Sequence, residues 1–237
     1  MTSLVLVDFD DTLVDTAPRF LSRRNRLFDW LEDLGFAREE ALSVHHDVVE
    51  QELLPVWGYG PFRLAPSFRD TYVRLCVRHG KAPSRDLARA ASSLADGIED
   101  PSPPLPGALE ALEHLAARRT VAIWTQSHFP SFQWSALEAA GVLRIVSRER
   151  ILIVPGKSPS SFGAALQALE PGAGSRPWMI GNSVRHDVNP ALASGARAIR
   201  VRCTSEWHMD GAPPLHSGFL EAPDFQSAVR QLLSADG

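Results

Sequence analysis

The sequence contains little lysine, little cysteine and no long hydrophobic run. Two of its 24 basic residues are lysines, Lys81 and Lys157, and the rest are arginines. Its two cysteines, Cys76 and Cys203, form no metal-binding or redox motif, which favours a reducing, cytoplasmic setting. No apolar stretch approaches the roughly 20 residues that a membrane span needs. The N-terminus has no basic region before its apolar residues, so we expect no secretory signal there.

A net basic charge is also lacking. The 237 residues carry a formal net charge of −4, with 44% hydrophobic and 22% charged residues, which is ordinary globular composition. With this net charge the chain lacks the excess of basic residues that non-specific binding to nucleic acid needs. We expect neither a nucleic-acid nor a membrane partner. A lysine that is retained in such an arginine-rich background indicates a position that needs a compact ammonium group.

The pattern of apolar residues changes twice along the chain. Residues 4–7 are apolar throughout, which is typical of a central strand in a parallel sheet. Helical periodicity then dominates up to residue 96, and the segment DPSPPLP at 100–106 indicates a linker. The helices expected in this part cover 18–33, 38–54, 67–79 and 84–96, with a loop at 57–61.

Helices and strands alternate after the linker. Such alternation predicts a parallel sheet with helices on both faces. The expected helices cover 107–118, 131–140, 159–169, 189–194 and 223–234. The expected strands cover 120–125, 144–147, 177–181 and 197–201, and a loop is expected at 171–177. We therefore predict a Rossmann-like α/β core formed by residues 1–16 and 100–237, with a helical domain, 17–99, inserted after the first strand.

The first strand runs directly into a group of acids, in the segment LVLVDFDDTLVDT. Asp8, Asp10 and Asp11 lie within four positions, and carboxylates this close repel one another and resist burial. The carboxyl ends of the strands are where open α/β sheets bind ligands. Residues two apart at a strand end point to the same side, so Asp8 and Asp10 can face one ligand. Either the strand ends there with its acids facing water, or a positively charged group lies among the acids.

The D-x-D-x-T pattern after an apolar strand resembles the first signature of the haloacid dehalogenase superfamily, in its phosphatase branch. The resemblance implies that Asp8 is a nucleophile that becomes an aspartyl phosphate and that Asp10 is the general acid and base. Thr12, the threonine of the pattern, is assigned to substrate binding. The segment TVAIWTQS resembles the second signature, which implies that the Thr125 hydroxyl donates to a phosphoryl oxygen.

Two further segments match the family in order. Lys157, in VPGKSPSSF, stands where the family places a lysine that pairs with the phosphoryl group and the nucleophile. The segment WMIGNSVRHDV resembles the metal-binding signature, except that Asn182 replaces the usual aspartate while Asp187 is kept. The implied cofactor is Mg²⁺, with ligands from Asp8, the carbonyl of Asp10, Asn182 and Asp187. An amide oxygen can bind Mg²⁺ but brings no charge, so weaker metal binding is expected.

The resemblance implies a Mg²⁺-dependent phosphatase of a small phosphorylated metabolite. The helical insertion matches the family's cap in position and size, and is expected to close over the site and set the substrate. Arg19 and Arg63 are the predicted substrate contacts, since arginine can hold a second anionic group. Arg23 and Tyr59 are further candidates. The oligomeric state and the role of loop 205–216 are left open.

Several alternatives remain open from the sequence. A haloacid dehalogenase needs neither the acid at Asp10 nor a metal. A phosphonate-cleaving relative needs a cap lysine, for which Lys81 is the candidate, and a phosphomutase needs protection of the phosphoenzyme from water. A non-catalytic scaffold that binds a phosphorylated ligand belongs to another class. The pairs His45-His46-Asp47 and His186-Asp187 raise the further alternative of an HD-type metal phosphohydrolase, whose fold is all helical.

Overall fold

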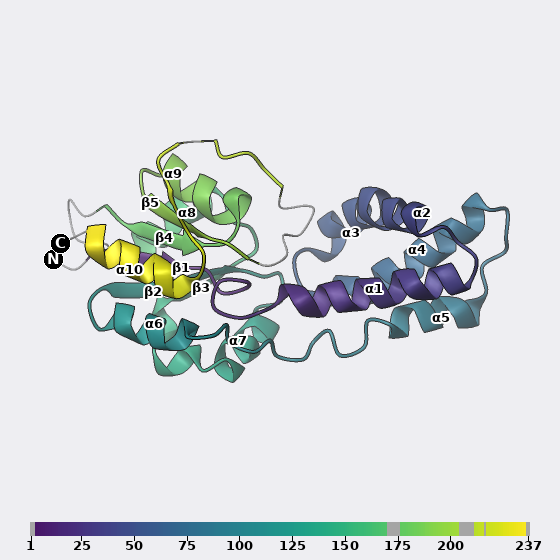
Figure 1. The fold of residues 1–237 in the computed structure, drawn as a ribbon, viewed down its shortest axis with the longest axis horizontal. Coiled ribbons are helices and arrows are strands. Elements are labelled where there is room, and N and C mark those ends of the chain that lie inside the picture. Colours follow the sequence, from purple (N-terminus) through teal and green to yellow (C-terminus); the bar gives the residue numbers. More distant parts are fainter. Residues whose placement is uncertain (1–2, 170–175, 204–210, 216, 236–237) are drawn as a thin grey trace. The chain divides into compact units, whose positions relative to one another are not determined.

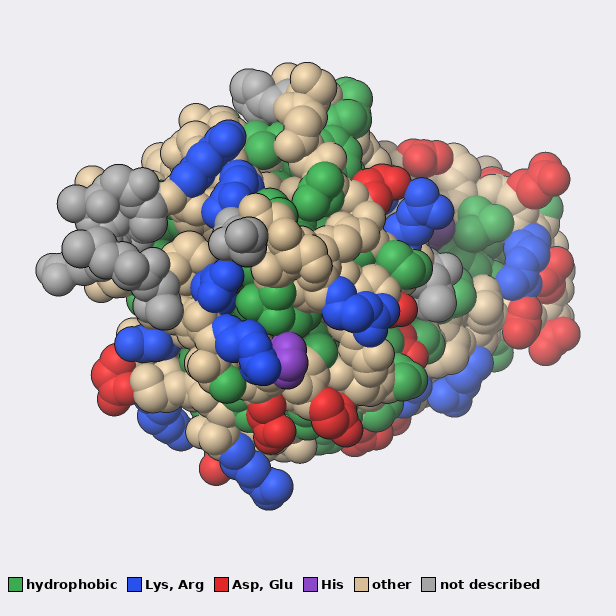
Figure 2. Space-filling view, turned by 60° about the vertical axis from the view of Figure 1, so that its left-hand side comes forward, with side chains coloured by type: hydrophobic (Ala, Val, Ile, Leu, Met, Phe, Trp, Pro, Cys, Tyr) green, Lys and Arg blue, Asp and Glu red, His purple; other side chains and the backbone are tan. Residues whose placement is uncertain are grey.

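The computed structural model describes residues 3–169, 176–203, 211–215 and 217–235. The chain folds into two compact units, a core unit of residues 1–17 and 101–237 and a helical unit of residues 18–100. Within the described ranges, no helix combines the length and the apolar character that a membrane crossing requires. On the face drawn in Figure 2, basic and acidic side chains are interspersed.

The core unit contains a six-stranded parallel sheet in the order β3-β2-β1-β4-β5-β6, which confirms the predicted α/β fold. β1 lies between β2 and β4, and this central place explains why all four of its residues are apolar and buried. The strands are β1 (Leu4–Val7), β2 (Thr120–Gln126), β3 (Ile151–Val154), β4 (Trp178–Gly181), β5 (Arg197–Val201) and β6 (Leu220–Ala222).

Helices cover both faces of this sheet (Figure 1). Side chains alternate across β1, so Val5 and Val7 join the hydrophobic cluster on one face while Leu4 and Leu6 join the cluster on the other. The first face is covered by α6 (Ala108–Ala116), α7 (Pro130–Ala139) and α10 (Phe225–Ala235). The second face is covered by α8 (Pro159–Leu169) and α9 (Asn189–Ala193).

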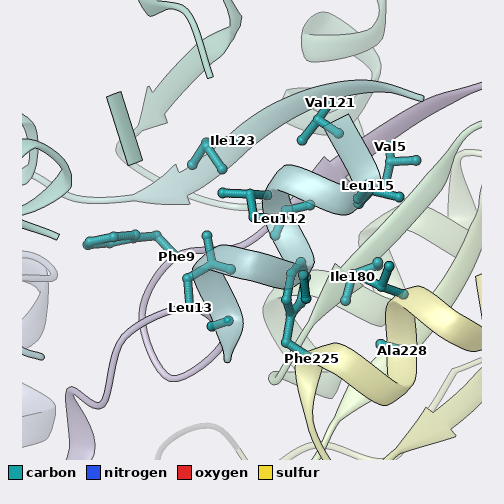
Figure 3. Packing of buried hydrophobic residues seen from close by; sticks show 14 of the residues in the cluster. Val5, Phe9, Leu13, Leu112, Leu115, Val121, Ile123, Ile180, Phe225 and Ala228 are labelled. Carbon is teal, nitrogen blue, oxygen red and sulfur yellow. The ribbon is translucent and has the colours of Figure 1, made fainter. Parts of the chain in front are cut away.

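The loop after β1 is anchored beneath the acids. Phe9 and Leu13 are buried in the first cluster, where Figure 3 shows them beside Leu112 of α6. The loop also joins the linker, because the Leu105 amide donates to the Leu13 carbonyl at 2.9 Å and the Asp15 amide donates to the Pro103 carbonyl at 2.9 Å. Apolar burial on one side and backbone hydrogen bonds on the other therefore hold the acidic segment in place.

The helical unit has its own hydrophobic core, built around Leu27, Phe28, Leu31 and Phe68. Its regular elements are all helical, as predicted for the insertion. They are α1 (Ala17–Asp33), α2 (Arg38–Ser43), a π-helix (Val44–Val49), α3 (Glu50–Trp57), a 3₁₀ turn (Pro61–Arg63), α4 (Leu64–Arg78) and α5 (Arg85–Ser93). The expected single helix over 38–54 is thus divided by a π-helical segment.

One predicted strand was wrong and one strand was missed. The strand expected at 144–147 is replaced by 3₁₀ turns over Val142–Arg144 and Arg148–Arg150, and the strand that pairs with β2 is β3, seven residues further on. The edge strand β6 was not predicted. The loops expected at 171–177 and 205–216 lie largely outside the described residues.

Glu50 is a buried carboxylate of the helical unit, and its ionisation makes the stability of the fold depend on pH. Its side chain is fully buried, and Arg63 and Arg24 place Nη2 at 3.1 Å and 3.4 Å from its Oε2. Burial raises the pKa of Glu50, but Arg63, His45 and Arg24 outweigh burial and lower it to about 2 from an ordinary value of 4.5. Ionised Glu50 therefore stabilises the fold fully above pH 4.5, and this contribution is lost as the pH falls toward 2.

We expect the free energy of unfolding to fall by at most about 1.4 kcal/mol per pH unit in that window from this group. Glu50→Gln should flatten this pH dependence, measured by denaturant titration at several pH values. The matched control is Glu52→Gln on the same helix, whose side chain is 54% exposed beside Arg74 and should change the slope little. Parallel slopes for wild type and Glu50→Gln would contradict the prediction.

Candidate active site

The candidate residues of the core unit lie at the carboxyl ends of four adjacent strands. Asp8 directly follows β1, and Thr125 is the penultimate residue of β2. Lys157 follows the end of β3, and Asp187 lies in a π-helix, Val184–Val188, shortly after β4. Because the sheet order is β3-β2-β1-β4, these four positions share one edge of the sheet.

The ammonium group of Lys157 lies between two carboxylates. Its Nζ is 2.5 Å from Oδ1 of Asp8 and 2.6 Å from Oδ1 of Asp187. All three side chains are buried, with exposed fractions of 3% for Lys157, 8% for Asp8 and 1% for Asp187. Nζ also lies 5.0 Å from the centroid of the Trp124 ring, a cation–π distance. The structure thus brings three predicted site residues into direct contact.

When Asp8 is ionised, negative charge exceeds positive charge at this centre. Burial, followed by repulsion from Asp187, raises the pKa of Asp8 to about 8, although Lys157 opposes the rise. Burial disfavours the charged form of Lys157, but Asp187 and Asp8 together raise its pKa above the usual value. The lysine therefore stays protonated, and its single ammonium faces two carboxylates only when Asp8 is ionised. Further positive charge would favour the ionised form of Asp8.

Asp187 is held by the turn that follows β4. Its Oδ2 accepts a hydrogen bond from the Ser183 amide at 3.0 Å, and the Ser183 hydroxyl in turn accepts one from the His186 amide at 3.1 Å. Gly181, the last residue of β4, leaves the space for this carboxylate. A Cβ added at Gly181 would lie 2.4 Å from Cγ of Asp187, so only glycine fits beneath it.

Gly181→Ala is therefore expected to destabilise the protein by about 1–3 kcal/mol, because the added methyl group must displace the buried Asp187 carboxylate. The matched control is Gly163→Ala in α8, where an added Cβ has nothing within 4 Å and alanine favours the helix. The control should stabilise by about 0.5–1 kcal/mol. Denaturant titration of both variants measures the difference, and equal effects would contradict the proposed role of Gly181.

The Asp10 carboxylate is held by hydrogen bonds on both oxygens. Oδ1 accepts from the Thr16 hydroxyl at 2.7 Å, and Oδ2 accepts from Nε2 of Gln133 at 2.8 Å. The same Nε2 lies 3.0 Å from Oγ1 of Thr125, which is fully buried. Asp10 and Thr125 are therefore linked through one side chain of α7.

Asp11, the third acid of the group, has a different environment. It is the one non-glycine residue with positive φ in the described ranges, at +56°, a conformation that aspartate tolerates better than most residues. Its Oδ1 accepts from the amides of Thr16 and Ala17 at 2.9 and 2.6 Å. Burial outweighs these hydrogen bonds and raises the pKa of Asp11 to about 7. Asp11 thus stabilises the backbone conformation of the loop after β1.

Thr12 and Asn182, two further predicted site residues, differ in whether they contact Asp8. The Thr12 hydroxyl donates to Oδ2 of Asp8 at 3.3 Å, so this residue contacts the predicted nucleophile. Asn182 lies toward β5, with Nδ2 at 3.8 Å from Sγ of Cys203 and its backbone carbonyl accepting from Nε of Arg200 at 3.3 Å. Asn182 also lines a cavity of about 270 Å³ beside β4 and β5.

Arg19 and Arg63, the predicted substrate contacts, both bind other groups of the protein. Arg63 is buried, and its guanidinium is engaged with Glu50 and with the Gly58 carbonyl, at 2.5 Å from Nη1. These contacts belong to the interior of the unit. Arg19 is half-buried and donates through Nη1 to the Asp100 carbonyl.

The donors near Asp8 fit Mg²⁺ in type and charge. Asp8, Asp187 and the Asp10 carbonyl are oxygen donors, and the excess negative charge around Lys157 would be offset by a divalent cation. In the part of the chain that the structure describes, no three histidine, cysteine or acidic side chains converge on one point. This is compatible with Mg²⁺, which proteins often bind through one or two carboxylates while substrate phosphate and water complete the shell.

The two histidine segments belong to different units, and among the described residues neither takes part in a metal-binding group of three. His45 is buried in the helical unit, with Nδ1 at 3.0 Å from the Thr71 hydroxyl, whereas His186 belongs to the core unit. Lys81, the candidate for an imine, is exposed, and its Nζ lies 5.0 Å from the centroid of the Phe36 ring.

Sequence reasoning missed three residues that contact the site. Thr16 and Gln133 bind the Asp10 carboxylate, and Gly181 makes room for Asp187. Gly181 had a signal, because it lies within the segment that resembles the metal-binding signature. Gln133 had none, since an isolated glutamine in a helix carries no recognisable spacing.

Comparison with known proteins places this geometry in context. A family model described as haloacid dehalogenase-like hydrolase matches residues 2–195. A search of curated proteins found no match.

Three solved structures share the fold. A haloacid dehalogenase-like family hydrolase from Xanthomonas campestris gives a TM-score of 0.77 at 24% identity, covering 99% of this chain and 93% of its own. The HAD-hydrolase YfnB from Bacillus subtilis, bound to magnesium, gives 0.60 at 13% identity, covering 99% and 98%. The L-2-haloacid dehalogenase from Xanthobacter autotrophicus gives 0.56 at 14% identity, covering 98% and 99%. At these identities the likeness concerns the fold.

Proposed function

Because the chain belongs to the haloacid dehalogenase-like hydrolase family, we propose that it is a phosphoric monoester hydrolase that acts on a small phosphorylated metabolite. In this proposal the reaction is Mg²⁺-dependent, takes place in the cytoplasm and passes through an aspartyl phosphate on Asp8. The helical unit takes the role of the family's cap, and Arg19 is a candidate for substrate contact.

One observation carries the choice of phosphatase over dehalogenase. Asp10, two residues after Asp8, has a carboxylate that is held on both oxygens, by Thr16 and by Gln133. Hydrolysis of a phosphate ester requires a proton at the leaving oxygen, and a positioned carboxylic acid supplies it. Displacement of a halide requires no such acid, because the halide leaves as a stable anion.

The first step is attack on phosphorus. An oxygen of ionised Asp8 forms a bond to phosphorus as the bond from phosphorus to the leaving oxygen breaks, and Asp10 gives its proton to that oxygen. Lys157 and the Thr125 hydroxyl bind phosphoryl oxygens and stabilise the charge that they carry. In the second step, water attacks the same phosphorus, Asp10 takes a proton from that water, and Asp8 is released with free phosphate.

Asp8, Asp187 and the Asp10 carbonyl are the residues that would hold Mg²⁺, with Asn182 as a candidate fourth ligand. The bound ion would supply positive charge that reduces the repulsion between the phosphate and the Asp8 carboxylate. Lys157 keeps Asp187 and Asp8 close together at the same time.

The first experiment is phosphate release from an aryl phosphate with Mg²⁺ and, in parallel, with excess chelator. We expect release with the metal and a loss of about 10²-fold or more in the chelated sample. Comparable release in both samples would contradict the metal dependence. Absence of release from this probe and from a set of phosphorylated metabolites would contradict the phosphatase assignment.

A second candidate function is favoured by the Lys157 bridge. The ammonium already neutralises part of the charge of Asp8 and Asp187, an arrangement that would let Asp8 act without a metal. The relatives described as L-2-haloacid dehalogenases share this fold. Halide release from chloropropionate in the presence of chelator tests this alternative directly. Such release, with no phosphate release, would replace the phosphatase assignment.

A further inference from the structure

Gln133 is the residue at the site to which neither the family resemblance nor the proposed mechanism assigns a role. It lies in the first turns of α7, and its side chain is 4% exposed. The preceding turn aims it at the sheet edge, because the Ser127 hydroxyl accepts from the Phe129 amide at 3.0 Å and Pro130 then begins the helix. Asp10, Thr125 and Gln133 all belong to the core unit.

The orientation of the Gln133 amide follows from its neighbours. The nitrogen of the amide faces Asp10, and Nε2 donates to Oδ2 of Asp10 at 2.8 Å. That nitrogen carries two protons, and the second is directed at Oγ1 of Thr125, at 3.0 Å. Both donors of one amide group are therefore used on two predicted site residues.

This double contact has a consequence for each partner. For Asp10, it fixes the plane of the carboxylate together with the Thr16 hydroxyl on the other oxygen. For Thr125, accepting from Gln133 uses a lone pair and leaves the single hydroxyl proton for a different acceptor. A phosphoryl oxygen is the acceptor that the proposed reaction would bring to this edge.

We propose that Gln133 is a positioning residue, which holds the Asp10 carboxylate for proton transfer to the leaving group and directs the Thr125 hydroxyl proton toward the phosphoryl group. The inference rests on the proposed phosphatase function. A residue that merely ties α7 to the loop after β1 would show the same hydrogen bonds, so the test must respond to proton transfer rather than to folding.

The dependence of the reaction rate on the leaving group responds to proton transfer in this way. Phenyl phosphate releases a basic oxygen that needs the Asp10 proton, whereas dinitrophenyl phosphate releases an anion that is stable without one. The quantity to measure is kcat/KM with Mg²⁺ for both substrates, since it reports only on the steps up to phosphoryl transfer. The variants are Gln133→Met, which keeps the side-chain length and removes the donors, and the control Gln167→Met on the exposed side of α8.

We expect Gln133→Met to lower kcat/KM for phenyl phosphate by about 10²-fold, as a misplaced acid would. For dinitrophenyl phosphate the expected loss is about threefold to tenfold, the share that depends on Thr125. Gln167→Met should leave both values unchanged. The ratio of the two kcat/KM values is independent of the fraction of folded enzyme, so partial unfolding of a variant cannot imitate the result.

A double-mutant cycle adds a second readout. In an Asp10→Asn background, Gln133→Met should cost only about threefold to tenfold on phenyl phosphate, the share that depends on Thr125, because the acid on which it also acts has been removed. Equal losses on the two substrates, or an undiminished loss in the Asp10→Asn background, would overturn the positioning role while leaving the phosphatase function intact. Wild-type protein that releases phosphate neither from these two substrates nor from the set of phosphorylated metabolites would overturn the proposed function itself.

Discussion

Asp8→Asn should reduce phosphate release by about 10⁴-fold or more, the scale of effect seen when a catalytic nucleophile is removed. Asparagine has nearly the same shape but offers no anionic oxygen to phosphorus. The measurement is phosphate release with Mg²⁺ under saturating substrate. Acid-quenched samples analysed by mass spectrometry should show a phosphoenzyme for wild type and none for Asp8→Asn.

The same substitution should not harm the fold in metal-free buffer. Because burial and Asp187 raise the pKa of Asp8 to about 8 from an ordinary 3.8, the native state holds a proton there that the unfolded chain releases. Stability from this group therefore falls as the pH rises through that window. Asp8→Asn removes the ionisation, so it should melt at least as high as wild type near neutral pH and gain relative to wild type toward pH 8.

The control for Asp8→Asn is Asp224→Asn. Asp224 is exposed, and its Oδ1 accepts from the Ser227 amide at 2.6 Å at the start of α10. Asparagine caps a helix about as well as aspartate, so activity and melting temperature should both stay at the wild-type values. Activity of Asp8→Asn within tenfold of wild type would sink the assignment of Asp8 as the nucleophile.

The sequence predicted the parts of the fold that repeat a strong pattern. β1 is a continuous apolar run in the centre of the sheet, and an apolar run of this length that ends in a group of acids is typical of a buried parallel strand. The long amphipathic helices of residues 18–100 and the alternation after residue 107 were predicted for the same reason. The placement of Asp8, Thr125, Lys157 and Asp187 at one edge of the sheet then followed from parallel topology, whereas their order along that edge did not.

Short segments escaped prediction because their apolar residues serve a purpose other than strand pairing. Val142 and Val146 are buried in the first hydrophobic cluster, but they reach it from 3₁₀ and turn conformations. Their spacing imitates a strand, since a short apolar run does not distinguish a strand from a packed turn. The π-helices over Val44–Val49 and Val184–Val188 depend on tertiary packing, and no local residue pattern signals them.

The sequence likewise did not show which charged side chains are buried. Arg63 could be seen as an arginine near a loop, yet its position is decided by Glu50, which lies thirteen residues earlier in the chain and is fully buried. Lys157 shows the opposite case. The scarcity of lysine in the chain indicated a position that needs a compact ammonium, and the structure places that ammonium between Asp8 and Asp187.

Lys157→Met should therefore have the largest effect on stability. Methionine keeps the apolar stem against Trp124 but leaves the buried carboxyl groups of Asp8 and Asp187 facing each other without a cation. Removing one partner of a buried ionic group costs about 3–5 kcal/mol, and we expect a loss of this size in metal-free buffer, measured by denaturant titration. The control, Lys81→Met, removes an exposed ammonium beside the Phe36 ring and should cost less than about 1 kcal/mol.

A second substitution and added Mg²⁺ distinguish the effect of the lost charge at Lys157 from the effect of lost packing. Asp8→Asn in the Lys157→Met background removes one of the two opposed carboxylates, so it should recover part of the lost stability, as coupled neighbours do. Mg²⁺ at about 100 times its Kd should return about 2.7 kcal/mol to Lys157→Met, because the ion would bind the folded protein at the same carboxylates. If instead Lys157→Met costs no more than Lys81→Met, and neither the second substitution nor Mg²⁺ changes its stability, the ammonium does not hold the two carboxylates together. Since Asp8 can attack phosphorus only when its charge is tolerated beside Asp187, that outcome would also remove the electrostatic basis for its role as the nucleophile.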